Sequence, residues 1–123
     1  MSRRILVVED QEDNRRIIRD LLTSVGYQLI EAHDGEAGVR LAAAERPDLI
    51  LMDIQLPVLD GYEATRRIKA DPLLRSIPLI VVTSYALSGD DAKAEAAGCD
   101  AYVAKPFSPR QLLATIRRFL PEP

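Results

Sequence analysis

The fold is decided by the stretch LILMD at residues 49–53, in which four consecutive apolar side chains lead directly into an acid, Asp53. Two further runs have the same form: ILVV at residues 5–8 precedes Glu9 and Asp10, and LIVV at residues 79–82 precedes Thr83. Continuous aliphatic runs are typical of buried parallel strands, because helices cover both faces of such a sheet. In open α/β sheets, ligands gather at the carboxyl ends of the strands. The sequence therefore predicts three carboxylates and a hydroxyl at one edge, a pattern typical of a metal-dependent phosphoryl site.

The rest of the chain alternates strand and helix patterns. We expect strands at residues 4–8, 27–32, 49–52, 79–82 and 101–104, and helices at residues 14–25, 34–45, 62–70, 90–97 and 109–120. Asp34 is suited to cap the second helix, and Ser108 with Gln111 forms a capping-box pattern at the last. Repeated strand–helix units imply right-handed crossovers and a parallel sheet. We expect an α/β fold in which residues 1–123 form one doubly wound domain.

Composition excludes several function classes. A chain of 123 residues with 47% hydrophobic and 28% charged residues can bury a real core. Its net charge of −3, without a basic stripe, argues against nucleic acid and against an anionic membrane surface. No apolar run is long enough for a signal peptide or a membrane span. Cys99 is the only cysteine, which favours an inert buried thiol and a cytoplasmic location.

Two helices carry further expectations. Five apolar residues of the first helix share one face at helical spacing: Ile17, Ile18, Leu21, Leu22 and Val25. Three arginines lie away from this stripe and are expected to be solvated: Arg15, Arg16 and Arg19. The helix at residues 90–97 offers only small side chains to the core, namely Ala92, Ala96 and Ala97. Because small apolar faces anchor a helix weakly, we expect this helix to be among the less stable elements.

The polar residues at the strand ends suit phosphoryl chemistry. Two adjacent carboxylates, Glu9 and Asp10, repel each other unless a cation or a proton offsets them, and carboxylate oxygens suit Mg²⁺. Asp53 could be a nucleophile that forms an acyl phosphate, and it could be a third metal ligand. The two roles are compatible. Lys105 follows the fifth strand and could stabilise a transferred phosphoryl group, to which Thr83 could donate a hydrogen bond.

Four motifs together resemble the receiver domains of response regulators. They are VED at residues 8–10, LMDI at 51–54 with LP at 56–57 and DG at 60–61, VTS at 82–84, and AYVAKPF at 101–107. The resemblance runs from about residue 4 to residue 120, and its acidic pair is Glu-Asp where the family more often has Asp-Asp. Residues 49–57 and the length of the chain resemble small stand-alone members.

The resemblance implies a flavodoxin-like sheet with strand order 2-1-3-4-5. It further implies that Asp53 accepts a phosphoryl group from a histidine kinase or a histidine phosphotransfer protein. In that family pattern the Mg²⁺ ligands are Asp10, Asp53 and the backbone carbonyl of Gln55, with Glu9 acting through water. Thr83 and Lys105 match the phosphate contacts, Tyr102 matches the aromatic switch residue, and a cis bond is expected between Lys105 and Pro106. Output would pass to a downstream partner protein.

Two other classes fit the residues less well. A phosphatase with an aspartyl nucleophile, of the haloacid-dehalogenase type, wants a second Asp two residues after the first, where this chain has Gln55. A flavin or nucleotide binder needs a phosphate loop after the first strand, where the acidic run EDQED at residues 9–13 would repel a phosphate unless a metal ion intervened.

Overall fold

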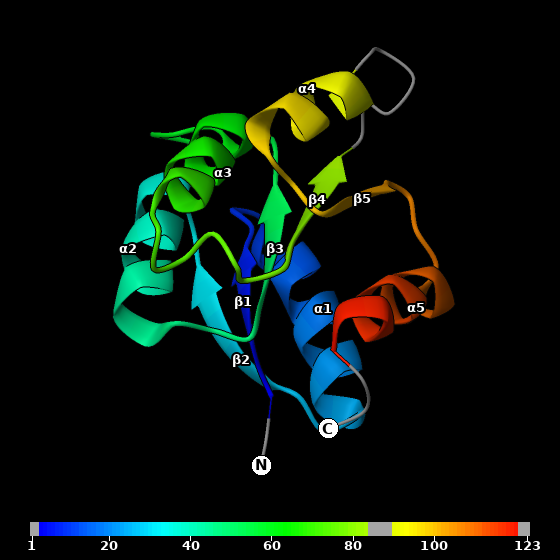
Figure 1. The fold of residues 1–123 in the computed structure, drawn as a ribbon. Helices are drawn as coiled ribbons and strands as arrows, with labels where there is room; N and C mark the ends of the chain where they lie inside the picture. The colour runs from blue at the N-terminus through cyan, green and yellow to red at the C-terminus, as the bar shows by residue number, and fades with distance from the viewer. Residues whose placement is uncertain (1–2, 84–89, 121–123) are drawn as a thin grey trace.

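The computed structural model describes residues 3–83 and 90–120, which form an α/β sandwich (Figure 1). The strands are β1 (Arg4–Val8), β2 (Gln28–Ala32), β3 (Leu49–Asp53), β4 (Leu79–Thr83) and β5 (Ala101–Ala104). The helices are α1 (Glu12–Ser24), α2 (Gly35–Glu45), α3 (Gly61–Ala70), α4 (Asp90–Ala97) and α5 (Pro109–Phe119). All strand pairs are parallel in the order β2-β1-β3-β4-β5, which confirms the expected flavodoxin-like fold. Ser84 of the VTS motif lies outside the described residues.

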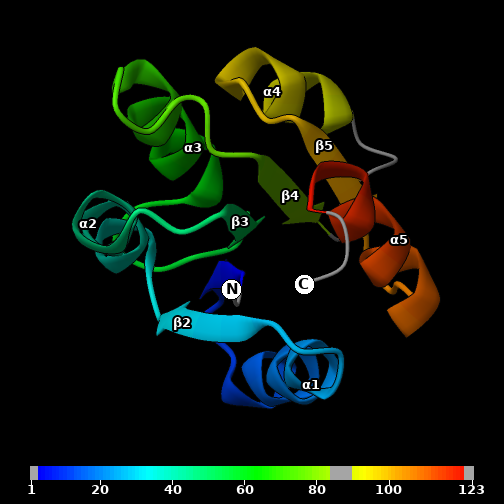
Figure 2. The same cartoon turned by 60° about the horizontal axis from the view of Figure 1, so that its bottom comes forward.

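Helices cover both faces of the sheet. Figure 2 shows α1 and α5 on one face and α2, α3 and α4 on the other. Successive side chains of a strand point to opposite faces. Ile5 and Val7 of β1 accordingly pack in the cluster that contains Leu22 of α1, while Leu6 and Val8 pack in the cluster beneath the other helices. This double burial explains why the strands read as unbroken apolar runs.

Capping side chains define where most helices begin. Asp34 Oδ1 accepts a hydrogen bond from Ala37 N at 2.7 Å, and Asp60 Oδ1 accepts one from Glu63 N at 2.9 Å. The capping box at α5 is present, since Ser108 Oγ accepts from Gln111 N and Gln111 Oε1 accepts from Ser108 N. α1 has no such side-chain cap at Gln11, and it begins at Glu12, two residues before the expected start.

The end of α5 is held at the edge of the sheet where the parallel strands start. The hydroxyl of Tyr27, which lies just before β2, donates a hydrogen bond to the carbonyl oxygen of Leu120 at 3.2 Å. Tyr27 N donates to Leu22 O within the turn that ends α1, so β2 begins at Gln28 and not at Tyr27. The hydrogen bond therefore joins the end of α5 to the edge where the parallel strands start.

Two expectations about helix faces were wrong. Ile17 is 60% exposed, and Arg15, expected in solvent, is only 6% exposed. In α4 the buried side chains are Ala94 and Ala97, whereas Ala92 and Ala96 are exposed. Residues 94 and 97 lie three apart on one face, so the helix is rotated relative to the expected orientation. A helix without a large apolar side chain gives no strong signal for which face is buried.

Among the residues that the structure describes, no helix has the length and apolar character needed to span a membrane.

Candidate phosphoryl-transfer site

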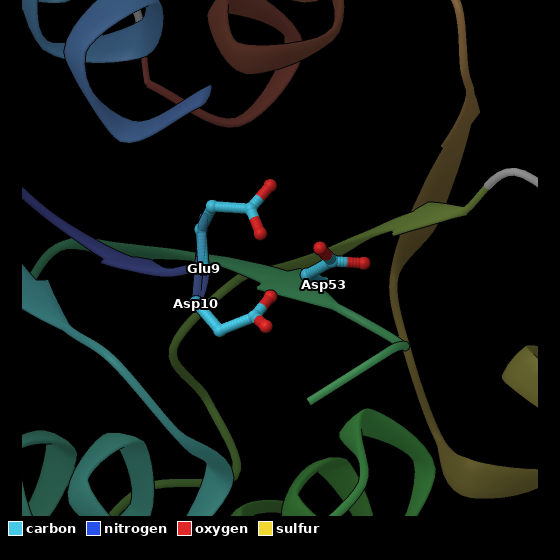
Figure 3. A group of neighbouring side chains, drawn as sticks. All are labelled: Glu9, Asp10 and Asp53. Carbon is cyan, nitrogen blue, oxygen red and sulfur yellow. The ribbon is translucent and has the colours of Figure 1, made fainter. Parts of the chain in front are cut away.

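Three carboxylates converge at the carboxyl edge of the sheet (Figure 3). Glu9 and Asp10 directly follow β1, and Asp53 is the last residue of β3. Each of the three offers a carboxylate oxygen, and these oxygens all lie within 4.8 Å of one another. We call Glu9, Asp10 and Asp53 the acid cluster. The two neighbouring parallel strands bring it together, as the sequence predicted.

Lys105 lies against two members of the acid cluster. Its Nζ is 3.1 Å from Asp53 Oδ2 and 3.3 Å from Glu9 Oε1. The loop after β5 is held beside β4, because Lys105 N donates to the carbonyl oxygen of Thr83 at 2.7 Å. The expected cis bond between Lys105 and Pro106 is present.

Backbone amides also point at the acids. Gln55 N donates to Asp53 Oδ1 at 3.2 Å, and Gln11 N donates to Glu9 Oε2 at 3.3 Å. The start of α3 also lies close to the backbone of Asp53, because a Cβ on Gly61 would overlap with the carbonyl oxygen of Asp53. Glycine is therefore required at that position for α3 to begin so close to the end of β3.

Burial and repulsion set the charge state of the cluster. Glu9 is 2% exposed and Asp53 is 6% exposed. Burial raises the pKa of Glu9 above its ordinary value and Asp53 raises it further, while Lys105 offsets the rise only in part. Burial alone would lower the pKa of Lys105, but its attraction to Asp53 and Glu9 outweighs this and leaves the pKa raised. Glu9 and Asp53 thus share one ammonium group, and Asp10 adds a third carboxylate beside them.

The donor set fits a hard divalent cation. Carboxylate oxygens are the ligands that Mg²⁺ prefers, and the ion needs only one or two of them alongside water and phosphate oxygens. The negative charge that Lys105 leaves uncompensated supplies the electrostatic reason for such an ion to bind. The acid cluster could therefore hold a metal ion.

The structure brings most of the other expected site residues to this edge. Thr83 is 1% exposed and ends β4, adjacent to β3 in the sheet. Tyr102 is not at the edge itself: it lies on β5 in register with Val81, two residues before Thr83 in β4, and is 39% exposed. Gln55 is exposed in the loop that follows β3.

A groove of about 470 Å³ borders the acid cluster. It runs between α1 and the loop after β5, and its lining residues are Glu9, Asn14, Ile17, Ile18, Lys105, Pro106 and Phe107. The exposed side chain of Ile17 lines this groove.

One residue expected in solvent, Arg15, instead lies next to the acid cluster. Arg15 is buried, and its Nη1 donates to the backbone carbonyl oxygen of Glu9 at 2.7 Å. A signal was present, since Arg15 lies three residues before Ile18 and seven before Leu22, on the buried stripe of α1.

Comparisons with known proteins show the family to which the chain belongs. The family model for the response regulator receiver domain matches residues 5–117. The polar-differentiation response regulator DivK of Brucella anthropi is 43% identical over 120 residues, covering 98% of both chains. DivK of Brucella ovis is 42% identical with the same coverage.

Solved structures show the same fold. The receiver domain of the sensor histidine kinase PA1611 from Pseudomonas aeruginosa PAO1 is 43% identical, with a TM-score of 0.91 over 97% of this chain and 98% of that one. That crystal structure has a magnesium ion coordinated in its active-site cleft. The chemotaxis response regulator CheY4 of Vibrio cholerae is 27% identical, with a TM-score of 0.91 over 98% of this chain and all of that one. The chain therefore belongs to the response regulator receiver-domain family.

Proposed function

We propose that residues 1–123 form a single receiver domain that works as a phosphorylation switch, with Asp53 as the acceptor. The phosphoryl group would come from a histidine kinase or a histidine phosphotransfer protein, and the signal would pass to a partner protein. One observation carries the proposal: Asp53 ends β3 within the acid cluster, with Lys105 Nζ 3.1 Å from its Oδ2. A carboxylate at that position has both a metal site and a fixed cation beside it.

The cofactor in this proposal is Mg²⁺. Asp10, Asp53 and the backbone carbonyl of Gln55 would hold the ion directly, and Glu9 would act through a bound water. When bound, Mg²⁺ supplies charge neutralisation between the carboxylates and the incoming phosphoryl oxygens. The mutual distances within the acid cluster support this assignment, as does the magnesium in the receiver domain of PA1611.

Transfer would be a displacement at phosphorus. A carboxylate oxygen of Asp53 forms a bond to phosphorus while the bond from phosphorus to the donor's imidazole nitrogen breaks, and the imidazole leaves. Lys105 stabilises the negative charge on the transferred oxygens, and Thr83 donates a hydrogen bond from its hydroxyl. Gln55 N, which donates to Asp53 Oδ1 at 3.2 Å, helps to orient the acceptor.

Labelling with a small phosphodonor tests this proposal. The wild-type chain should incorporate a phosphoryl group from acetyl phosphate in Mg²⁺, and chelation of the metal should stop it. Asp53→Asn removes the anionic nucleophile while nearly preserving its shape, so this variant should remain unlabelled by intact mass and phosphate-affinity electrophoresis. Asp60→Asn provides a control, because Asp60 caps α3 outside the acid cluster. Equal labelling of wild type and Asp53→Asn at one site would overturn the assignment.

The groove beside the acid cluster supports a protein phosphodonor. It presents Ile17, Pro106 and Phe107 next to Lys105 and Glu9, so a partner helix could seat apolar side chains there while holding a phosphohistidine over Asp53. We assign the docking of the kinase or phosphotransfer protein to this groove.

The output surface in this proposal is the face formed by α4, β5 and α5. Phosphate on Asp53 would draw the Thr83 hydroxyl toward it, and Tyr102 would turn inward. Among the described side chains of α4, only Ala94 and Ala97 are buried, which supports a weakly held helix. Hydrogen exchange of α4 and β5 with and without a phosphoryl mimic tests this step. Unchanged protection, together with a partner that still distinguishes the two forms, would contradict it.

No described contact favours the phosphatase alternative over the switch. Gln55 occupies the position where that chemistry wants an acid, and sustained release of phosphate from small external substrates would be needed to revive it.

A further inference from the structure

Arg15 is the most deeply buried cation that the structure describes. Arg15 is 6% exposed and lies on α1, next to the turn that joins β1 to α1. Its Nη1 donates to the carbonyl oxygen of Glu9 at 2.7 Å, and its Nε lies 3.5 Å from Glu31 Oε1. The guanidinium therefore links α1 to the backbone of an acid-cluster residue and to β2.

Glu31 is itself held in place from the other side. Arg19 Nη2 donates to Glu31 Oε1 at 2.7 Å, and Arg19 Nε donates to Glu31 Oε2 at 2.9 Å, a two-point contact with defined geometry. The order of contacts runs from Arg19 through Glu31 and Arg15 to the backbone of Glu9. Each group in this series restricts the next one.

Stability alone is a poor explanation for this arrangement. Arg15 Nε lies within ion-pair distance of Glu31 but makes no hydrogen bond to a described residue, and a buried donor without a hydrogen bond is costly. Replacing buried ion pairs by apolar side chains of similar size is often neutral or stabilising. Leu22 and Ile18 share the buried stripe with Arg15, so an apolar side chain would fit the pattern at this position.

The turn that Arg15 fixes carries two members of the acid cluster. Glu9 N donates to the carbonyl oxygen of Ala32 at 3.0 Å, and the Glu9 carbonyl accepts from Arg15, so both sides of the Glu9 backbone are held. Asp10 follows directly, with its peptide nitrogen bonded to that carbonyl carbon. A rotation of the Glu9 peptide would therefore change the position of the Asp10 carboxylate relative to Asp53.

We propose that Arg15 is a positioning residue for the metal site, acting through the Glu9 carbonyl to keep Glu9 and Asp10 aimed at Asp53. The proposal rests on the function proposed above, in which the acid cluster binds Mg²⁺. Groups that orient metal ligands typically change metal affinity by roughly 10–100-fold when they are lost. For Arg15→Met, which keeps the length but removes every donor, we expect Mg²⁺ to bind about 10-fold more weakly.

The test is a Mg²⁺ titration without any phosphodonor. Binding is monitored by calorimetry and by the NMR amide resonances of Asp10 and Gln11. Arg15→Lys retains one donor for the Glu9 carbonyl but loses the contact to Glu31, so its affinity should fall between those of wild type and Arg15→Met. Arg16→Met is the matched control, because Arg16 is the next residue, is 61% exposed at its side chain and should leave the affinity unchanged. Phosphorylation of Arg15→Met by acetyl phosphate should be restored largely by raising the Mg²⁺ concentration.

The outcomes separate this inference from the proposed function. Wild-type Mg²⁺ affinity in folded Arg15→Met, with Asp53 still labelled in the wild type, overturns the positioning role alone. Weakened affinity in that variant, with no labelling of wild-type Asp53, supports the positioning role and overturns the proposed function. If Arg15→Met does not fold, Arg19→Met replaces it, since loosening Glu31 should weaken Mg²⁺ binding in the same direction by a smaller factor. Unchanged affinity there also contradicts the inference.

Discussion

Lys105 Nζ lies 3.1 Å from Asp53 Oδ2, although 52 residues separate the two in the chain. The contact depends on the sheet order, which places β4 between β3 and β5. Lys105 N donates a hydrogen bond to Thr83 O, so the lysine side chain reaches across the end of β4 to the end of β3. The ammonium group is therefore fixed beside the carboxylate before any phosphate arrives.

Lys105→Met should slow the labelling of Asp53 by acetyl phosphate on the order of 100-fold, because a fixed donor at a developing charge is worth about that much. Rates at saturating Mg²⁺ measure the effect. Lys93→Met, an exposed change on α4, should label at the wild-type rate. A wild-type rate for Lys105→Met would remove Lys105 from the transfer step.

Asp10→Ala should affect metal binding and stability in opposite directions. Its loss removes one anionic oxygen from the acid cluster and should weaken Mg²⁺ binding. Without metal, relief of carboxylate repulsion should raise the free energy of unfolding by about 1 kcal/mol. Urea unfolding in a chelator and in Mg²⁺ checks both effects, and an unchanged response to Mg²⁺ would move Asp10 out of the metal site.

Val58→Gly should stabilise the chain. Val58 has φ of 71° in the loop after β3 and is 76% exposed, and Leu59 N donates to Pro57 O across it at 2.7 Å. A β-branched residue is strained in this tight turn. Glycine relieves the strain but adds an entropic cost. The net effect should be a free energy of unfolding in urea that is higher by about 1 kcal/mol.

Val58→Ala separates the two effects at this position. Alanine keeps the Cβ, and with it the strain, so its free energy of unfolding should stay close to that of wild type. A loss of stability in Val58→Gly of the size usual for glycine in a loop would show that Val58 is unstrained.

The contribution of Arg19 to stability should depend on pH. Hydrogen bonds from Arg19 lower the pKa of Glu31 and outweigh the opposing effect of burial. A carboxylate whose pKa is lower in the folded state stabilises that state above its ordinary pKa, about 4.3, and loses the contribution as the pH falls through the folded value. The stability difference between wild type and Arg19→Met should be full near pH 7 and shrink in acid. A difference that stays constant down to acid pH would contradict the pairing.

Ile17→Ser should separate protein donors from small ones. Ile17 is exposed in the groove beside the acid cluster, and its apolar side chain has no group that could take part in phosphoryl transfer. Transfer from a phosphorylated histidine phosphotransfer protein should slow, while labelling by acetyl phosphate should not change. Leu73→Ser, a change at another exposed apolar residue, should affect neither reaction. Equal slowing with both donors would place the effect of Ile17 on the acceptor and not on docking.

The strands and the acid cluster could be predicted because their signals lie in residue type. Unbroken apolar runs mark strands that are buried on both faces. An acid at the end of such a run must therefore lie at the carboxyl edge of the sheet. The burial of Arg15 had a signal in the helical spacing of α1, but its partner could not be assigned in the same way, because Arg15 binds a backbone carbonyl and a carbonyl is present at every residue. The burial of Ala94 in α4 was equally hard to predict, since the helix has four alanines and no large apolar side chain to mark its buried face.

The hydrogen bond between Tyr27 and Leu120 has a practical consequence for handling the molecule. It holds the end of α5 at the edge where β1 and β2 start, and the acid cluster lies at the other end of the strands, after β1 and at the end of β3. A surface tether or fluorescent label attached at Arg4 therefore lies at the end of the strands away from Asp53. Immobilised protein should keep its acceptor open to a phosphodonor in solution, so binding and transfer can both be followed on a sensor chip.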